Sequence, residues 1–211
     1  YSAFPKLASY DWEYSVKPSF AVIYVTGNIV TGEGITGENA GSDSIAGAIK
    51  SARENPLIRG IILRINSGGG SALASDIIAR EVALCKEGDN PKPVVVSMGG
   101  AAASGGYYIA APAARIFADP VTITGSIGVI AIFPDISGLL EKLDIKSETV
   151  KRSESGDFGN FTRPMTEDEI EKIRSFIEES YGQFVNVVSK GRGISREMVD
   201  KSGRGRVWTG S

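Results

Sequence analysis

Ser104 is surrounded by residues with little or no side chain, in the tract Ala102-Ala103-Ser104-Gly105-Gly106. The tract follows an apolar run that predicts a buried strand, and it precedes the start of a predicted helix. A serine at such a turn is accessible to a substrate carbonyl, and the free N–H groups of a helix start favour developing negative charge. Ser104 is therefore a candidate nucleophile, although a serine that only caps a helix in a tight turn would have the same pattern.

Two glycine-rich tracts could complete a site with this serine. Asn66-Ser67-Gly68-Gly69-Gly70-Ser71 ends a predicted parallel strand, which is where open α/β sheets bind ligands. Its glycines can adopt positive φ and turn a backbone N–H outward, as an oxyanion hole requires. Its spacing does not match the known phosphate-binding glycine patterns. Thr124-Gly125-Ser126-Ile127-Gly128 is a second such tract, and each of the two, taken alone, is compatible with a simple turn.

The chain contains no histidine, which restricts the mechanisms open to a serine nucleophile. A Ser-His-Asp arrangement and a histidine-based metal site are excluded within it. An aspartate remains possible as the base, and so does a lysine if burial lowers its pKa from about 10.4 toward neutral pH. Acidic residues are scattered or gathered at 167–171, where they suit the first turn of a helix. We therefore expect neither a metal nor a cofactor.

Composition sets further limits on the protein. The 211 residues, 42% of them apolar, can form one domain with a hydrophobic core. The net charge of -2, with both signs interspersed, gives no extended basic surface, so we expect no nucleic-acid partner. No apolar stretch reaches the roughly 20 residues of a membrane-spanning helix. Residues 1–18 are expected to be a lead-in or linker from a longer protein, and 19–211 one domain truncated at its C-terminus. The single cysteine, Cys85, is expected to be buried.

Alternating apolar strands and amphipathic helices must position these residues. Strands are predicted at 20–25, 58–65, 93–98, 115–118, 127–133 and 146–150. One helix is predicted from about Ser44, and a second contains Leu73 and Leu84. Two more are predicted at 105–111 and at 136–143, and an exposed loop is predicted at 151–163. Thr166 and Glu169 form a capping box that starts a long amphipathic helix ending near Lys190. This alternation predicts an α/β fold with a mainly parallel sheet.

Taken in order, the motifs resemble the signal peptide peptidase A family. Besides the tracts already named, the resemblance rests on Val96-Ser97-Met98-Gly99-Gly100, Tyr107-Tyr108 and Val207-Trp208-Thr209-Gly210, and it spans residues 20–210. It implies the Clp protease and crotonase-like fold, a superhelix of β-β-α units, and a Ser-Lys dyad that cleaves remnant signal peptides. It also implies a homo-oligomer, a tetramer or larger ring, on the extracytoplasmic side of the bacterial cytoplasmic membrane and anchored by residues outside this chain.

The resemblance also implies roles for individual residues. Ser104 becomes the nucleophile, and Gly70 and Gly105 become the N–H donors of the oxyanion hole. Ser126 matches a serine that hydrogen-bonds and positions the catalytic lysine, so a tract that otherwise predicts only a turn gains a function.

The catalytic lysine is where the chain departs from the family pattern. In short members the lysine precedes the long helix, but the matching tract here, Ser155-Gly156-Asp157, contains none. The chain resembles the C-terminal half of the long members, whose lysine comes from the N-terminal half. We therefore expect a missing N-terminal half to supply the base. Lys151 and Lys146 are the competing candidates within the chain.

Two other functions remain open at this point. A crotonase-type acyl-CoA enzyme would also pair two backbone N–H groups, although neither a CoA pocket nor suitable carboxylates are evident. A protein that keeps the fold without activity could act as a scaffold. Apolar residues near the motifs could line a pocket for a hydrophobic peptide or belong to the core, namely Tyr107, Tyr108, Ile130 and Phe133.

Overall fold

The computed structural model describes residues 18–35, 37–153 and 155–211, so most of the expected lead-in at 1–18 lies outside the described residues. Within these ranges, one sheet has the strand order β1 (Ser19–Thr26), β4 (Ile58–Ser67), β5 (Val94–Ala103), β7 (Ile123–Gly125) and β8 (Val207–Thr209), with β6 (Arg115–Phe117) beside β5. All pairs are parallel except β7 with β8. The predicted mainly parallel sheet is therefore confirmed.

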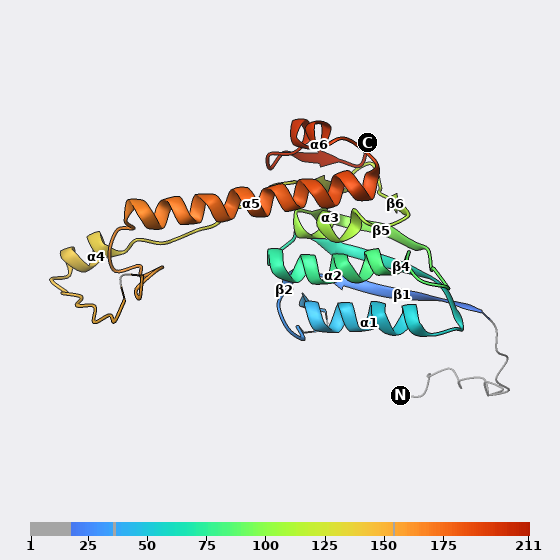
Figure 1. The fold of residues 1–211 in the computed structure, drawn as a ribbon, viewed down its shortest axis with the longest axis horizontal. Helices are drawn as coiled ribbons and strands as arrows, with labels where there is room; N and C mark the ends of the chain where they lie inside the picture. The colour runs from blue at the N-terminus through green and yellow to red at the C-terminus, as the bar shows by residue number, and fades with distance from the viewer. Residues whose placement is uncertain (1–17, 36, 154) are drawn as a thin grey trace, which may run out of the picture.

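Alternation along β1 separates a covered face of the sheet from an open one. Ile23 and Val25 are buried, whereas Phe20, Val22 and Tyr24 are exposed on the opposite face. The helices α1 (Ser42–Glu54), α2 (Ala72–Leu84) and α3 (Gly105–Ala110) lie along the covered face (Figure 1). The core between these helices and the sheet is aliphatic and includes Ile49, Leu63, Ile65, Ile78, Val96 and Ile109. A short parallel pair, β2 (Asn28–Val30) and β3 (Asn39–Gly41), precedes α1.

β5 is longer than the predicted strand at 93–98, since it continues through residue 103. The register between β4 and β5 shifts on the way, from Ile65 opposite Met98 to Ser67 opposite Ala102. Two additional residues of β5 are thus accommodated in a bulge. The side chain of Asn66 covers this bulge, and its Oδ1 accepts a hydrogen bond from the Ala101 N–H at 3.2 Å.

The predicted strands at 127–133 and 146–150 are wrong. Neither segment forms a strand in the described part of the chain. Ile127 is buried directly after β7, and the chain then leaves the sheet. The apolar side chains that suggested a buried strand are largely exposed, with Ile130 at 87% and Val150 at 94%. Two short elements near the C-terminus, α6 (Arg196–Ser202) and β8, have no counterpart among the predictions.

The long helix α5 (Glu167–Arg192) is confirmed, but only part of its apolar face is buried. The predicted capping box is present, with Glu169 N–H to Thr166 Oγ1 at 3.2 Å and Thr166 N–H to Glu169 Oε2 at 2.8 Å. Phe184 and Val188 pack into a second core cluster, whereas Phe176 is 63% exposed. The first half of α5 extends beyond the body of the molecule, with α4 (Ser137–Lys142) at its far end (Figure 1). We call residues 130–175 the arm.

None of the helices in the described ranges combines the length and apolar character needed to cross a bilayer.

Lys92 is a buried cation that closes the C-terminal end of α1. Its side chain is 2% exposed, and its Nζ donates hydrogen bonds to the carbonyls of Ala52, at 2.9 Å, and of Asn55. These carbonyls belong to the last turn of the helix and its C-cap, where no intrahelical donor is available. Cys85 lies in the same region and is buried as predicted, and burial raises the pKa of its thiol to about 11.

Lys92→Met keeps the length of the side chain but removes the ammonium group. Two carbonyls then lose their donor in a buried place, so we expect the free energy of unfolding to fall by about 3 kcal/mol. Urea denaturation followed by circular dichroism measures this loss. Lys50→Met, at an exposed position of the same helix, is the control and should change stability by less than about 0.5 kcal/mol. Equal stability of Lys92→Met and the unmodified protein would contradict this role.

Candidate active site

A cleft of about 880 Å³ contains the predicted site residues. Ser104, Gly105, Gly70 and Ser126 all line it, so the structure brings together residues from three separate tracts. The opposite wall comes from α5 and from the segment that leaves β7, and it is rich in apolar side chains, namely Val129, Ile130, Phe176, Ile177 and Phe184. The contribution of α5 to this wall has no counterpart in the sequence analysis.

Ser104 occupies the sharp turn between β5 and α3. Its backbone has φ 49° and ψ -120°, an unfavourable combination for a residue with a side chain. Two hydrogen bonds hold the turn: the Ser104 N–H donates to the Gly125 carbonyl at 2.9 Å, and the Tyr108 N–H donates to the Ser104 carbonyl at 2.8 Å. The Ser104 hydroxyl itself has no hydrogen-bond partner among the described residues. It therefore borders the cleft as an unengaged group.

The glycine loop after β4, residues 68–70, is held in place by backbone hydrogen bonds to Ile29. The Ile29 N–H donates to the Gly69 carbonyl at 2.9 Å, and the Ile29 carbonyl accepts from the Ser71 N–H at 2.8 Å. Gly70 lies between these two bonds, so in this parallel bridge its own N–H points away from Ile29. Neither this N–H nor that of Gly105 has an acceptor within the described ranges. Both residues line the cleft, so two backbone N–H groups without an acceptor in the described chain lie at its wall.

Glycine is required in this loop because the backbone approaches Ser104 closely. A Cβ on Gly69, which has φ 110°, would lie 2.8 Å from the Ser104 Cβ and 2.7 Å from the Gly105 nitrogen. A Cβ on Gly70 would collide with the Ile29 carbonyl. Any larger residue would therefore push the loop away from the serine.

Ser126 adopts a left-handed conformation, with φ 50°, directly after Gly125, with φ 76°. Its N–H donates to the Arg206 carbonyl at 2.7 Å, which ties this turn to the segment before β8. Its hydroxyl, like that of Ser104, has no partner among the residues that the structure describes.

Two tyrosine hydroxyls at the cleft are engaged with carboxylates. Tyr108 donates to Asp76 Oδ1 at 2.7 Å, and Tyr181 donates to Asp200 Oδ1 at 2.7 Å. Burial first, and then the hydrogen bond to the carboxylate, raises the pKa of each phenol above its usual value. Both phenols are therefore protonated at neutral pH and are unsuited to act as bases.

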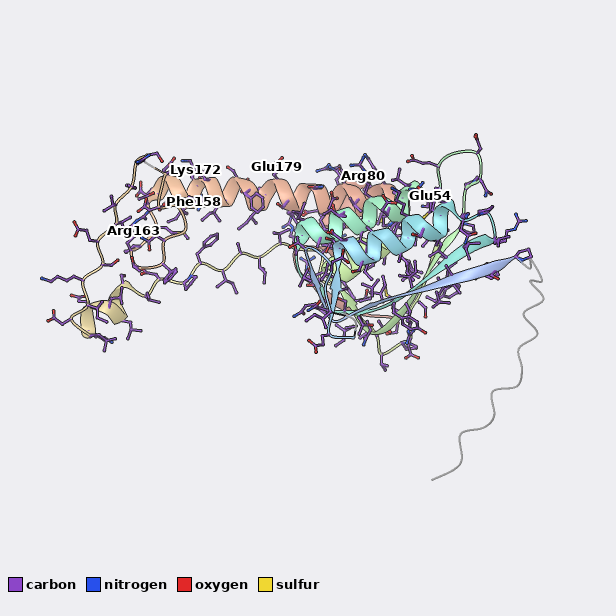
Figure 2. All side chains as sticks on the ribbon, turned by 90° about the horizontal axis from the view of Figure 1, so that it is seen from below. Glu54, Arg80, Phe158, Arg163, Lys172 and Glu179 are labelled. Atoms are coloured by element: carbon purple, nitrogen blue, oxygen red, sulfur yellow. The ribbon has the colours of Figure 1, made fainter. Side chains whose placement is uncertain are left out.

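Lys151 lies in the arm rather than at the cleft. Its Nζ pairs with Asp157 Oδ1 at 2.9 Å, and Asp157 also binds Arg163, which in turn binds Glu169 at the start of α5. Figure 2 shows Arg163 at the far end of the helix, away from the body. From Glu169 to Tyr181 the helix rises by about 18 Å. Asp157, in the tract where the resemblance implies a lysine in short family members, is thus part of this ion cluster.

No lysine of the described chain lines the cleft. The charged side chains recorded along the cleft are those of Glu178 and Arg204. Lys146, the other candidate, lines a separate hollow beside α4. Across the described residues, no group of three or more histidine, cysteine or carboxylate side chains could hold a metal ion.

Comparisons with known proteins agree with the predicted fold and motifs. A profile of Peptidase family S49 matches residues 86–211. Protease 4 of Haemophilus influenzae is 42% identical over 94% of this chain and 32% of that protein. A candidate signal peptide peptidase SppA of Enterococcus faecium is 39% identical over 77% of this chain and 47% of that protein. The chain thus spans about a third to a half of the length of these relatives.

Among solved structures, a point mutant of ClpP1 from Listeria monocytogenes matches with a TM-score of 0.53. The match covers 89% of this chain and 82% of that one at 16% sequence identity, so it bears on the fold alone. The predicted Clp protease-like fold is confirmed.

The ion cluster of the arm should make that region sensitive to acid. Hydrogen bonds from Arg163 lower the pKa of Asp157 and that of Glu169, the latter to about 2. A carboxyl group with a lowered folded pKa stabilises the fold above its unfolded pKa of about 4.3, and this contribution is lost as pH falls through the folded value. We therefore expect hydrogen-exchange protection of 157–170 to fall between about pH 4 and pH 2. Arg163→Gln should show low protection throughout, and constant protection of the unmodified protein over this range would contradict the assignment.

Proposed function

Because the chain belongs to peptidase family S49, we propose that it carries the nucleophile, Ser104, of a serine endopeptidase whose general base is a lysine. The observation that carries the proposal is the geometry of one cleft. There an unengaged serine hydroxyl lies beside two N–H groups, those of Gly70 and Gly105, that lack acceptors in the described chain. These are the groups that acyl transfer needs, namely a nucleophile and donors for the oxyanion.

The proposed reaction follows from these positions. Ser104 Oγ attacks the peptide carbonyl while a neutral lysine amine accepts the hydroxyl proton. The carbonyl oxygen becomes an oxyanion that binds the N–H groups of Gly70 and Gly105. Collapse of this intermediate breaks the C–N bond, and the lysine ammonium protonates the leaving amine. Water, deprotonated by the same lysine, then hydrolyses the acyl-enzyme and restores Ser104.

We propose that the lysine comes from a part of the protein outside these 211 residues. Three observations support this: Lys151 and Lys146 lie in the arm, no described lysine lines the cleft, and the chain matches only about a third of Protease 4. Ser126 is then the residue that accepts a hydrogen bond from the lysine and orients it. Its hydroxyl borders the same cleft and has no partner within the described residues.

The proposed substrates are hydrophobic peptides, remnant signal peptides among them. The apolar wall from α5 and from 129–130 supports this class, because such a surface gains free energy when it covers aliphatic side chains. The name of the Enterococcus relative points to the same substrates. We further propose that the whole protein acts at the extracytoplasmic side of the bacterial membrane as a homo-oligomer, a tetramer or larger ring.

Ser104→Ala in the full-length protein tests the nucleophile. Peptide cleavage should fall by at least about 10³-fold, since removal of a catalytic serine leaves only binding and oxyanion effects. A fluorophosphonate or β-lactone probe should label the unmodified protein at Ser104 and leave the variant unlabelled. Ser51→Ala, at an exposed position of α1, should retain both activities. Unchanged cleavage by Ser104→Ala would refute the assignment, and an acyl-CoA enzyme of this fold would not be labelled at Ser104.

Comparison of the 211-residue chain with the full-length protein tests the origin of the base. We expect the chain alone, shown to be folded by circular dichroism, to react with the probe about 10²- to 10⁴-fold more slowly, the usual contribution of a general base. Its rate should rise continuously with pH, because hydroxide then replaces the lysine. A chain as reactive as the full-length protein would contradict the proposal, and Lys151→Met would then show whether Lys151 is the base.

A further inference from the structure

The tract Val207-Trp208-Thr209-Gly210 is a sequence motif that the proposed reaction leaves without a role. We propose that Trp208 is a positioning residue, which fixes the peptide group between Gly125 and Ser126 and through it the orientation of both serines at the cleft. The inference rests on the proposed function, because it assigns Trp208 to the reaction of Ser104.

Strand β8 and the residues just before it pair with the turn that contains Ser126. It pairs antiparallel with β7, with Val207 opposite Gly125 and Trp208 opposite Thr124. Beyond the ladder, the Ser126 N–H donates to the Arg206 carbonyl at 2.7 Å, and the Gly205 N–H donates to the Ile127 carbonyl at 2.8 Å. The segment that precedes β8 therefore continues the contact past the end of β7.

A single peptide group connects this strand to the nucleophile. The Gly125 carbonyl accepts the Ser104 N–H at 2.9 Å, and the N–H of the same peptide group, that of Ser126, binds Arg206. Carbonyl and N–H of a trans peptide point in opposite directions, so this group spans the distance between β8 and Ser104. Rotation of the group about its flanking bonds would break both hydrogen bonds at once.

Glycine next to a peptide group makes such rotation easy, because glycine tolerates many φ and ψ combinations. Here the indole ring of Trp208 lies against Gly125: a Cβ on Gly125 would be only 2.6 Å from the Trp208 Cδ1. The ring thus fills the space beside the Gly125 Cα. Its Nε1 donates to the Ser202 carbonyl at 3.0 Å, which anchors the ring to the end of α6.

This support matters because the two serines adopt conformations that they would not hold by themselves. Ser104 and Ser126 have φ of 49° and 50°, which side chains disfavour. Such conformations persist only where surrounding contacts hold them. Trp208 is not among the residues that line the cleft, whereas its ring lies against Gly125, so the proposed effect passes through Gly125.

The test uses the full-length protein with Trp208→Ala, Trp208→Phe and a control, Phe117→Ala, which removes another exposed aromatic ring from a three-residue strand of the same sheet. We expect Trp208→Ala to lower kcat and the rate of fluorophosphonate labelling at Ser104 by about 10- to 100-fold, with KM within about twofold, since small misplacement of a nucleophile has effects of this size. Trp208→Phe keeps a ring against Gly125 and should restore both rates to within about threefold. Phe117→Ala should react like the unmodified protein.

The labelling rate per folded molecule separates positioning from a loss of stability, which would lower only the folded fraction. The inference is overturned if folded Trp208→Ala is labelled at the unmodified rate, or if Trp208→Phe is as slow as Trp208→Ala. Should Trp208→Ala fail to fold, Trp208→Leu takes its place, with a loss of about tenfold expected and an unmodified rate overturning the inference. If the unmodified full-length protein is neither labelled nor active on peptides, the proposed function fails instead, and the two failures are thereby distinguished.

Discussion

The close approach of the glycine loop to Ser104 is the constraint on which the cleft depends. Gly69 lies so near the Ser104 Cβ and the Gly105 nitrogen that no side chain fits between them. This contact requires β4 and β5 to end beside each other. Between the pairs Ile65–Met98 and Ser67–Ala102, however, β5 contains two more residues than β4. The bulge under Asn66 takes up the excess, and Ile29 then holds the loop in place. Small residues at the site therefore follow from sheet geometry as much as from chemistry.

Much of this arrangement could be predicted from the sequence, because its causes are local. The tracts around Gly70 and Ser104 each follow a predicted strand and were candidates for one site, and the structure places them at one cleft. The capping box of α5 was likewise evident from residues three positions apart. The roles of Ser104, Gly70, Gly105 and Ser126 in a reaction stay predictions.

Other features depend on contacts between segments far apart in the chain. β8 has only three residues, and its partner β7 is more than eighty positions earlier, so no local pattern indicates the pair. The segment 127–133 carries the apolar side chains of a strand, yet no neighbouring strand is available where it leaves the sheet. The apolar periodicity of α5 predicted the helix but not which part of its apolar face is buried. The body of the molecule reaches only its second half, so Phe176 remains exposed. In the arm, the start of α5 is held by its capping box and by the ion pairs of Arg163 with Asp157 and Glu169.

Lys92 connects two parts of the chain that are distant in sequence, the end of α1 and the loop that leads into β5. Its backbone N–H binds the Cys85 carbonyl at 2.7 Å, while its side chain holds the carbonyls of Ala52 and Asn55. Neither the loop nor the last turn of α1 can open without breaking these bonds and exposing a buried ammonium group. The two therefore form one cooperative unit of local unfolding, in which amide protons of the helix end and of the loop become accessible to solvent together.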